Sequence, residues 1–411
     1  MHTPSASGIL FISAVLASIE IYVTLKLLYY IGTLFPTRHK KYLAVLAVVF
    51  LLWTNSPLLY MLFFGRTTAP LPHWQLYGFV YPFYIWISSA LIIFLLYLVL
   101  DIPLLVFKII KKVYKVITRI IVNKNPGIRK NKSAAVDSDK RKFLKLGAAG
   151  LSLIPVSSMS YGIVYGSRKI ITKNVTIHFN HIPDSLRGLK IAQLSDIHCS
   201  DYVPKEKIAQ AVSLINAEKP DIVFLTGDYV PMDVDYIYIC IDALRALKAP
   251  FGIFASLGNH EEWTNARLIT RVIEQNDIPV LRNRGITITI KGERINILGV
   301  DDSRWGHADL DSALAQVPNG HFTILMSHEP EYWDYAVTKD INLTLAGHTH
   351  GGQLALPFTH SEANLGRLFH KYNAGLYEKN ELYLYVSTGL GFTGPPIRLN
   401  IPPEVVIITF Q

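Results

Sequence analysis

The sequence predicts an N-terminal α-helical region that crosses a membrane, followed by a layered α/β domain. Two observations predict this division. Residues 1 to about 107 are strongly apolar and aromatic, in runs long enough to span a bilayer. From about residue 170 onward, short apolar runs alternate with segments of helical period, as in strands and helices packed in layers. A chain of 411 residues is long enough for both parts.

Three membrane spans are expected within residues 1–107. They cover about residues 9–35, 42–64 and 76–100, and each is long enough to cross the hydrocarbon core as a helix. Tyr and Trp side chains cluster at the start of the third span, which is typical of the interface between membrane and water.

A basic segment follows the third span. Residues 108–145 hold 13 of the 40 Lys and Arg side chains and only two acids. Within residues 108–142, the bases first recur at three- and four-residue steps between aliphatic residues, and a polar stretch follows. This pattern predicts an amphipathic helix on a membrane surface and then a flexible linker. The alternative for the helical part is a cytoplasmic extension of the third span.

Residues 143–166 form a fourth apolar stretch, rich in small side chains. We expect it to be a fourth membrane span or a retained signal-anchor. The basic segments 36–41 and 108–145 should face the cytoplasm, because positive charge is retained on that side. Alternating crossings then place the domain that follows on the extracytoplasmic side.

The net charge of +9 does not indicate a nucleic-acid-binding protein. Residues 108–145 alone contribute +11, so the remainder of the chain is close to neutral. A local basic excess between apolar segments is explained by orientation in a membrane. We therefore expect the bilayer as a partner and no nucleic acid. The two cysteines, Cys199 and Cys240, exclude a disulfide scaffold.

Residues 170–411 are expected to form one α/β domain. Its predicted strands are short apolar runs at residues 189–194, 221–225, 251–256, 295–298, 321–326, 343–345, 382–386 and 405–410. Its predicted helices share a helical period, at about residues 204–218, 236–247 and 265–276.

Metal-ligating side chains follow five of these strands. They are Asp196, His198, Asp228, Asn259, His328, His348 and His350. Ligands of open α/β sheets bind at the carboxyl ends of strands, where these residues lie. The two-residue spacing of His348 and His350 places both imidazoles on one side of an extended backbone. Any one of these residues could be a surface side chain, but five strand ends together predict a metal site.

The chemistry of this set favours two divalent metal ions. Carboxylates and imidazoles together suit Mn, Fe, Zn, Ni or Co better than Ca or Mg. Seven ligands exceed what one tetrahedral zinc takes, but they suit two ions about 3.5–4 Å apart that share a bridging carboxylate. Such a pair activates a water and clamps two phosphate oxygens during in-line attack. The sequence offers no competing Ser-His-Asp, cysteine-based or phosphate-loop arrangement.

Five sequence blocks resemble those of the calcineurin-like metallophosphoesterase family. They are Asp196-x-His198, Gly227-Asp228, Gly258-Asn-His-Glu261, the lone His328 and Gly347-His-x-His350. Their order and spacing match over about residues 185–411. The closing segment Pro396–Asn400 is similar to the membrane-attached or exported bacterial branch. The resemblance implies a four-layer αββα sandwich, in which helices flank two sheets.

The resemblance also implies roles for the ligands. One metal would take Asp196, His198, Asp228 and His350, and the other would take Asp228, Asn259, His328 and His348, so that Asp228 bridges. His260 would protonate the leaving oxygen or stabilise the phosphate, a role that suits an imidazole beside a metal-bound phosphoester. Glu261 and Ser200 depart from the common family pattern, but neither departure removes a ligand.

These observations favour a membrane-anchored, two-metal phosphohydrolase that cleaves a phosphoester or pyrophosphate bond. The four spans would hold the site near a bilayer, so the substrate is expected to be a phosphoester, with a lipid-linked one as an option. The expected location is a bacterial inner membrane, with the catalytic domain on the extracytoplasmic side. The alternatives are a non-catalytic membrane receptor or scaffold with a metal-binding domain, and an extracytoplasmic nuclease or nucleotide phosphodiesterase.

Overall fold

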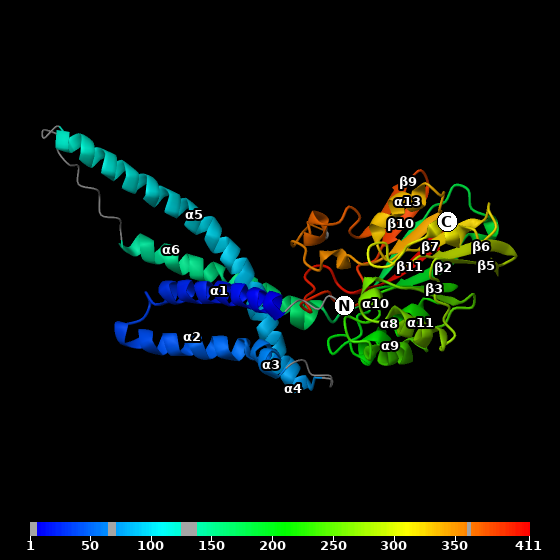
Figure 1. Cartoon of the computed structure of the whole chain (residues 1–411), viewed down its shortest axis with the longest axis horizontal. Helices are drawn as coiled ribbons and strands as arrows, with labels where there is room; N and C mark the ends of the chain where they lie inside the picture. Colours follow the sequence, from blue (N-terminus) through cyan, green and yellow to red (C-terminus); the bar gives the residue numbers. More distant parts are fainter. Residues whose placement is uncertain (1–5, 65–70, 125–137, 360–362) are drawn as a thin grey trace. The chain divides into compact units, whose positions relative to one another are not determined.

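The computed structural model describes residues 6–64, 71–124, 138–359 and 363–411 (Figure 1). Contacts between residues divide the chain into two compact units, with the division between Ser160 and Tyr161. The N-terminal unit is helical. The C-terminal unit is built from strands and helices.

The helices of the N-terminal unit range from 3 to 44 residues in length. They are α1 (Ala6–Ile31), α2 (Lys40–Thr54), α3 (Ser56–Phe64), α4 (His73–Gln75), α5 (Tyr81–Lys124), α6 (Ser138–Leu151) and α7 (Leu153–Tyr161). Among the described residues, three stretches could cross a membrane by length and composition: Leu10–Ile31, His73–Thr118 and Lys142–Gly166. The pair α2 and α3, bent by 53°, is a candidate for a fourth crossing. These stretches overlap the four expected spans, although His73–Thr118 extends well beyond the expected third span of residues 76–100.

Helix α5 continues without a break from the third expected span into the basic segment. The expected boundary at residue 107 therefore lies inside one helix, as the alternative of an extended third span predicts. Most of the expected linker, residues 125–137, lies outside the described residues. The expected domain boundaries stay predictions.

Two sheets form the middle of the C-terminal unit. The first has the strand order β1-β11-β2-β3-β4 and the second has the order β5-β6-β7-β8-β10-β9. The first sheet contains β1 (Ile171–Ile177), β11 (Glu404–Phe410), β2 (Lys190–Leu194), β3 (Ile222–Thr226) and β4 (Ile253–Ser256). The second contains β5 (Arg284–Ile290), β6 (Glu293–Gly299), β7 (Phe322–Met326), β8 (Leu343–Ala346), β10 (Leu382–Val386) and β9 (Gly375–Lys379).

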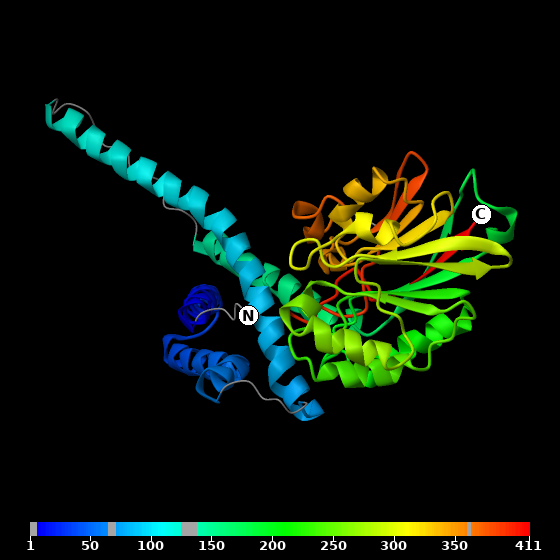
Figure 2. The same ribbon diagram turned by 45° about the vertical axis from the view of Figure 1, so that its right-hand side comes forward.

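Helices cover the outer face of each sheet, as Figure 2 shows for the green helices below the first sheet. Helices α8 (Lys205–Ala217), α9 (Tyr236–Leu244) and α11 (Ala266–Glu274) pack on the first sheet. Helices α12 (Leu310–Leu314) and α13 (Trp333–Val337) pack on the second. A short helix, α10 (Asn259–Trp263), follows β4.

The central strands are buried on both faces, because each sheet is covered twice. In β3, Ile222 and Phe224 point into the core between the sheets, whereas Val223 and Leu225 point toward the helices. This layering confirms the predicted αββα sandwich.

All eight predicted strands are present, but three strands were not predicted: β1, β5 and β9. Each lies at an edge of its sheet. Strand β1 exposes Lys173 and Asn174, and β9 exposes Glu378 and Lys379. Edge strands tolerate charge, so the hydrophobic pattern of β1 and β9 is weak. Strand β5 instead alternates Ile and Thr from Ile286 to Ile290, and this pattern was missed.

Candidate metal centre

The seven candidate ligands meet at one edge of the two sheets. Strands β2, β3 and β4 run parallel, as do β7 and β8, so the loops that leave their carboxyl ends share an edge. Each loop supplies one or two of the predicted residues. Six of the seven side chains are buried, and His348 is half-buried. Within the described residues, the structure therefore brings together every predicted ligand.

Three groups of side chains lie close enough together to hold a metal ion. They are Asp196 with His198 and His350, His198 with Asp228 and His260, and Asp228 with His328 and His348. In each group the potential ligand atoms lie within 4.8 Å of one another. The second group shares a residue with each of the other two, so the groups form one continuous cluster.

The first group converges on a pair of imidazole nitrogens. His198 Nε2 lies 3.1 Å from His350 Nε2. Asp196 Oδ1 lies 3.4 Å from His350 Nε2, and Asp228 Oδ2 lies 3.5 Å from His198 Nε2. Two nitrogens and two carboxylate oxygens thus point at one small volume, which is the arrangement of ligands around an ion.

The remaining group lies on the other side of Asp228. Its Oδ2 atom is 3.2 Å from His328 Nε2. His348 Nδ1 is 2.8 Å from the side-chain oxygen of Asn259. Asp228 therefore lies between the two sets and is the carboxylate that both could share.

A backbone hydrogen bond orients His328 for metal binding. Its Nδ1 atom lies 2.8 Å from the carbonyl oxygen of Thr226, which can only accept, so Nδ1 carries a proton. When the ring binds a metal, its lone pair is then on Nε2, which is buried and lies 3.2 Å from Asp228 Oδ2. A buried nitrogen of this kind fits a metal ligand held by its other ring nitrogen.

Most of the candidate ligands share an uncommon backbone conformation. Five of the seven candidate ligands have a positive φ: Asp196 (51°), His198 (47°), Asp228 (57°), His348 (72°) and His350 (50°). This conformation is uncommon for residues other than glycine and persists only where surrounding structure enforces it. Strain gathered on the candidate ligands is typical of a functional site.

Two glycines permit the loops to approach each other. A Cβ atom on Gly258 would lie 2.3 Å from Asp228 Oδ1 and 2.8 Å from the His328 ring. A Cβ atom on Gly347 would lie 2.2 Å from Asp196 Oδ2. Both positions therefore exclude any side chain.

Comparison with known proteins agrees with this geometry. The family model of the calcineurin-like phosphoesterases matches residues 189–352. The uncharacterized metallophosphoesterase YkuE of Bacillus subtilis is 33% identical over 281 residues, which cover 66% of this chain and 97% of that relative. The chain belongs to the calcineurin-like phosphoesterase family. It is therefore a metal-dependent phosphoesterase.

Two further relatives carry names that describe a membrane protein and a phosphodiesterase. A transmembrane protein with metallophosphoesterase domain from Bos taurus is 30% identical over 291 residues, covering 66% of this chain and 64% of the relative. The phosphodiesterase YaeI of Escherichia coli is 28% identical over 279 residues, covering 66% of this chain and 98% of the relative. The matches thus include both a membrane protein and an enzyme of phosphodiesters.

The electrostatics of the phosphoesterase site suit a cation. Burial lowers the pKa of His198 and of His348 to about 3, so both rings are neutral and able to bind a metal. Burial alone would raise the pKa of Asp228, but the neighbouring His328 holds it well below the usual value. Burial alone would lower the pKa of His328, but the carboxylates of Asp228 and Asp196 raise it well above its usual value. These buried carboxylates therefore favour positive charge beside them, which a divalent ion would supply.

His260 faces the cluster with one ring nitrogen free. Its Nδ1 atom donates a hydrogen bond to the carbonyl of Pro231. Its Nε2 atom lies 4.0 Å from Asp228 Oδ2. The predicted acid is thus beside the shared carboxylate, and Trp263 packs against its ring with centroids 4.6 Å apart.

Glu261 supports the site in a way that the sequence did not reveal. Its buried carboxylate accepts hydrogen bonds from the backbone N–H groups of Asp228, Tyr229 and Gly258, each at 2.8 Å. It therefore joins the loops after β3 and β4. Burial, together with the charge of Asp228, raises the pKa of Glu261 to about 8.

Arg398 is a second supporting residue that was not predicted. Its guanidinium is fully buried and donates to the carbonyls of Gly389 and Gly391 at 3.2 and 2.6 Å. It also lies 3.3 Å from His350 Nδ1. A possible signal was an arginine inside the apolar closing segment, since a buried charge is usually retained for a reason.

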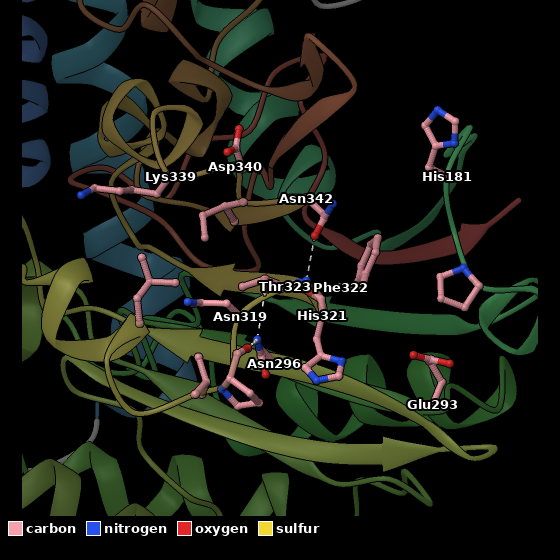
Figure 3. Close-up of a pocket in the computed structure, with 16 residues that line it drawn as sticks. His181, Glu293, Asn296, Asn319, His321, Phe322, Thr323, Lys339, Asp340 and Asn342 are labelled. Carbon is pink, nitrogen blue, oxygen red and sulfur yellow. Dashed lines mark hydrogen bonds between the residues drawn. The ribbon is translucent and has the colours of Figure 1, made fainter.

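A separate cavity lies away from the metal cluster. It has a volume of about 590 Å³ and is lined by residues that precede β7 and β8, including His321 and Asn342. The candidate ligands follow the opposite ends of these strands. Figure 3 shows Asn342 bonded to the backbone of Thr323, at 2.8 Å. The cavity therefore has no part in the phosphoesterase site.

Proposed function

We propose that this phosphoesterase is a membrane-anchored hydrolase that uses two divalent metal ions. One ion takes Asp196, His198, Asp228 and His350; the other takes Asp228, Asn259, His328 and His348. The observation that carries the proposal is the position of Asp228 Oδ2, within 3.5 Å of His198 Nε2 and 3.2 Å of His328 Nε2. The donor set suits Mn, Fe, Zn, Ni or Co.

The bound ions would supply an activated water and a positive clamp for two phosphate oxygens. The residues of the chain fix the geometry of this chemistry. Asp196 accepts hydrogen bonds from the backbone N–H of His348, at 2.9 and 3.1 Å. Asp228 accepts one from the backbone N–H of His260, at 3.0 Å. Both carboxylates are thereby held in one orientation before substrate binds.

His260 acts as the general acid in this proposal. Because Nδ1–H is committed to the Pro231 carbonyl, the other nitrogen is left to exchange a proton with the leaving oxygen. The substrate is a phosphoester or a pyrophosphate. A lipid-linked substrate fits a catalytic unit that follows candidate membrane spans.

The proposed location is a bacterial inner membrane with the catalytic unit outside the cytoplasm. The apolar helices support membrane association, and the Bos taurus relative is named a transmembrane protein. The distribution of bases supports the orientation, with 13 Lys and Arg in residues 108–145, which lead into the fourth expected span.

The test is an isosteric change of the shared carboxylate, Asp228→Asn. We expect the purified full chain to lose Mn²⁺-dependent hydrolysis of bis(p-nitrophenyl) phosphate and to hold less metal by elemental analysis, since a neutral amide bridges two cations poorly. Asp184→Asn is the matched control, because Asp184 forms only an exposed ion pair with Arg187. Full activity of the Asp228 variant would overturn the assignment.

A further inference from the structure

Exposed apolar side chains gather in one segment of the C-terminal unit. We call residues 354–359 and 363–369 the apolar lobe. Five large apolar side chains of the lobe are exposed: Leu356 (64%), Phe358 (100%), Leu365 (49%), Leu368 (74%) and Phe369 (80%). The described remainder of residues 161–411 has only eight such side chains. A concentration of this kind marks an interaction surface rather than ordinary exposure.

The apolar lobe is a folded element. Leu356 N–H donates to the carbonyl of Ala363 at 2.8 Å, and Leu365 N–H donates to that of Leu354 at 3.2 Å. A 3₁₀ turn, Leu365–Leu368, follows. The lobe thus keeps its large apolar side chains exposed although its backbone is hydrogen-bonded. Phe358 even adopts a φ of 65°, which is unfavourable for a bulky residue, while its ring is fully exposed.

One end of the apolar lobe is hydrogen-bonded to Leu399, whose neighbour Arg398 contacts the end of the last candidate membrane span. Ala355 N–H donates to Leu399 O, and Leu399 N–H donates to Gln353 O, both at 2.9 Å. The preceding residue, Arg398, packs its backbone against the end of that span. Arg398 N–H donates to Gly162 O at 3.2 Å.

The same end of the span carries the features of a membrane interface. Tyr161 and Tyr165 are exposed and stack on each other, with centroids 6.1 Å apart. Tyrosine is enriched where a helix leaves the hydrocarbon core. Arg168 and Lys169 follow and are exposed, as is Arg367 in the lobe. Exposed bases beside aromatic and aliphatic side chains suit anionic lipid headgroups.

We propose that the apolar lobe docks on the bilayer surface and inserts Phe358 and Leu368 among the lipids. The inference rests on the proposed membrane anchoring of the chain. The lobe begins four residues after His350, so its insertion holds the metal cluster at the level of the lipid headgroups. A phosphoester carried by a lipid would then reach the site without leaving the membrane.

The experiment measures depth in the bilayer with the full chain in vesicles of phosphatidylcholine and phosphatidylglycerol. Phe358→Cys and Leu368→Cys are labelled with bimane, and brominated acyl chains serve as quenchers. Thr289→Cys is the matched control, because Thr289 is exposed on β5, at the end of the unit opposite the orange lobe in Figure 1. The native Cys199 and Cys240 are buried, so the parent chain checks for background labelling.

We expect quenching at both lobe positions to be several times that at Thr289. Quenching equal to that at Thr289 would overturn the proposal. Bimane emission that shows an apolar environment without quenching would also overturn it, because a second copy of the chain would then cover the lobe. Flotation of the vesicles and hydrolysis of bis(p-nitrophenyl) phosphate are recorded with the same samples. Chain that does not float refutes the anchoring itself, whereas chain that floats and hydrolyses without quenching refutes only the docking of the lobe.

Discussion

At the scale of single residues, His260 is placed to exchange a proton, because its Nδ1 is bonded to the Pro231 carbonyl and its Nε2 lies 4.0 Å from Asp228 Oδ2. Replacing it by Gln removes the proton donor and keeps a polar side chain of similar reach. We expect kcat for phenyl phosphodiesters to fall about 10²–10³-fold, since general acid catalysis contributes on this scale. The loss should be smaller for p-nitrophenyl esters, whose leaving group needs no proton.

Steady-state kinetics with both esters, together with metal analysis, tests the role of His260. His321→Gln is the control, because His321 lies in the separate cavity. An equal loss for both leaving groups would show that His260 positions the phosphate instead of protonating the leaving oxygen.

Glu261 leads to a prediction about stability. In Glu261→Gln, one carboxylate oxygen becomes an NH₂ group that faces a backbone N–H, and that N–H is left unpaired. A buried unsatisfied donor costs about 1–3 kcal/mol, so the melting temperature should fall and metal content should decrease. Glu262→Gln is the neighbouring control, since Arg282, its partner, is also paired with Asp301. Scanning calorimetry of the full chain in detergent makes the comparison, and equal melting temperatures would contradict the bracing role.

The residues that the sequence could predict are those that carry chemistry in a recognisable order. The seven ligands and His260 each follow a predicted strand, so strand ends were enough to place them together. Glu261 and Arg398 escaped because their roles depend on partners distant in the sequence. Arg398 reaches His350, 48 residues earlier in the chain, only after the closing segment has folded back.

At the scale of elements, the last turn of the fourth candidate span is packed without space to spare. A Cβ atom on Gly166 would lie 2.0 Å from the carbonyl oxygen of Arg398. Gly166→Ala must therefore displace Arg398, which contacts His350. We expect weaker metal retention and a melting temperature lowered by several degrees, as for overpacking of about 1–3 kcal/mol.

Gly147→Ala is the matched control for this change. Gly147 is a helical glycine with no atom within 4 Å of its added Cβ, so alanine there should be neutral or stabilising through helix propensity. Metal content after dialysis against a chelator separates the two variants. Equal retention would show that the end of the span is not coupled to the cluster.

Lys207 on α8 gives a prediction about pH. Its amine donates to the carbonyl of Ser167 at 2.8 Å, and burial, with the charge of Arg398, lowers its pKa from 10.5 to about 7. Between these two values the unfolded chain binds a proton that the folded chain lacks, so this group makes stability rise with pH. Lys207→Met should raise the melting temperature most near the lower value, and the gain should vanish toward the higher one.

Thermal unfolding at a series of pH values tests the effect of Lys207. Lys205→Met is the control, because Lys205 forms an exposed ion pair with Asp242 and is expected to change stability little at any pH. A constant difference between Lys207→Met and the parent across the series would contradict the lowered pKa.

At the scale of the whole molecule, the layers of the fold were predicted from the sequence more completely than the edge strands of its sheets. The central strands are buried on both faces, so they form continuous apolar runs that are recognisable in the sequence. The junction between the third expected span and the basic segment was not predicted, because α5 stays helical throughout, even at Pro103. Charge changes along this helix while its secondary structure does not.

The final prediction concerns which side of the membrane holds each unit. Residues 108–145 carry 13 Lys and Arg, whereas Arg168, Lys169 and Lys173 are the bases that first follow the fourth candidate span. Because the larger basic group is retained in the cytoplasm, the domain after the span should lie outside it. In intact spheroplasts, a membrane-impermeant maleimide should label Glu378→Cys, which is exposed on β9, and should not label Lys111→Cys until the membrane is permeabilised. The parent chain, whose two cysteines are buried, should stay unlabelled. Labelling of Lys111→Cys but not Glu378→Cys in intact spheroplasts would reverse the orientation and place the phosphoesterase site in the cytoplasm.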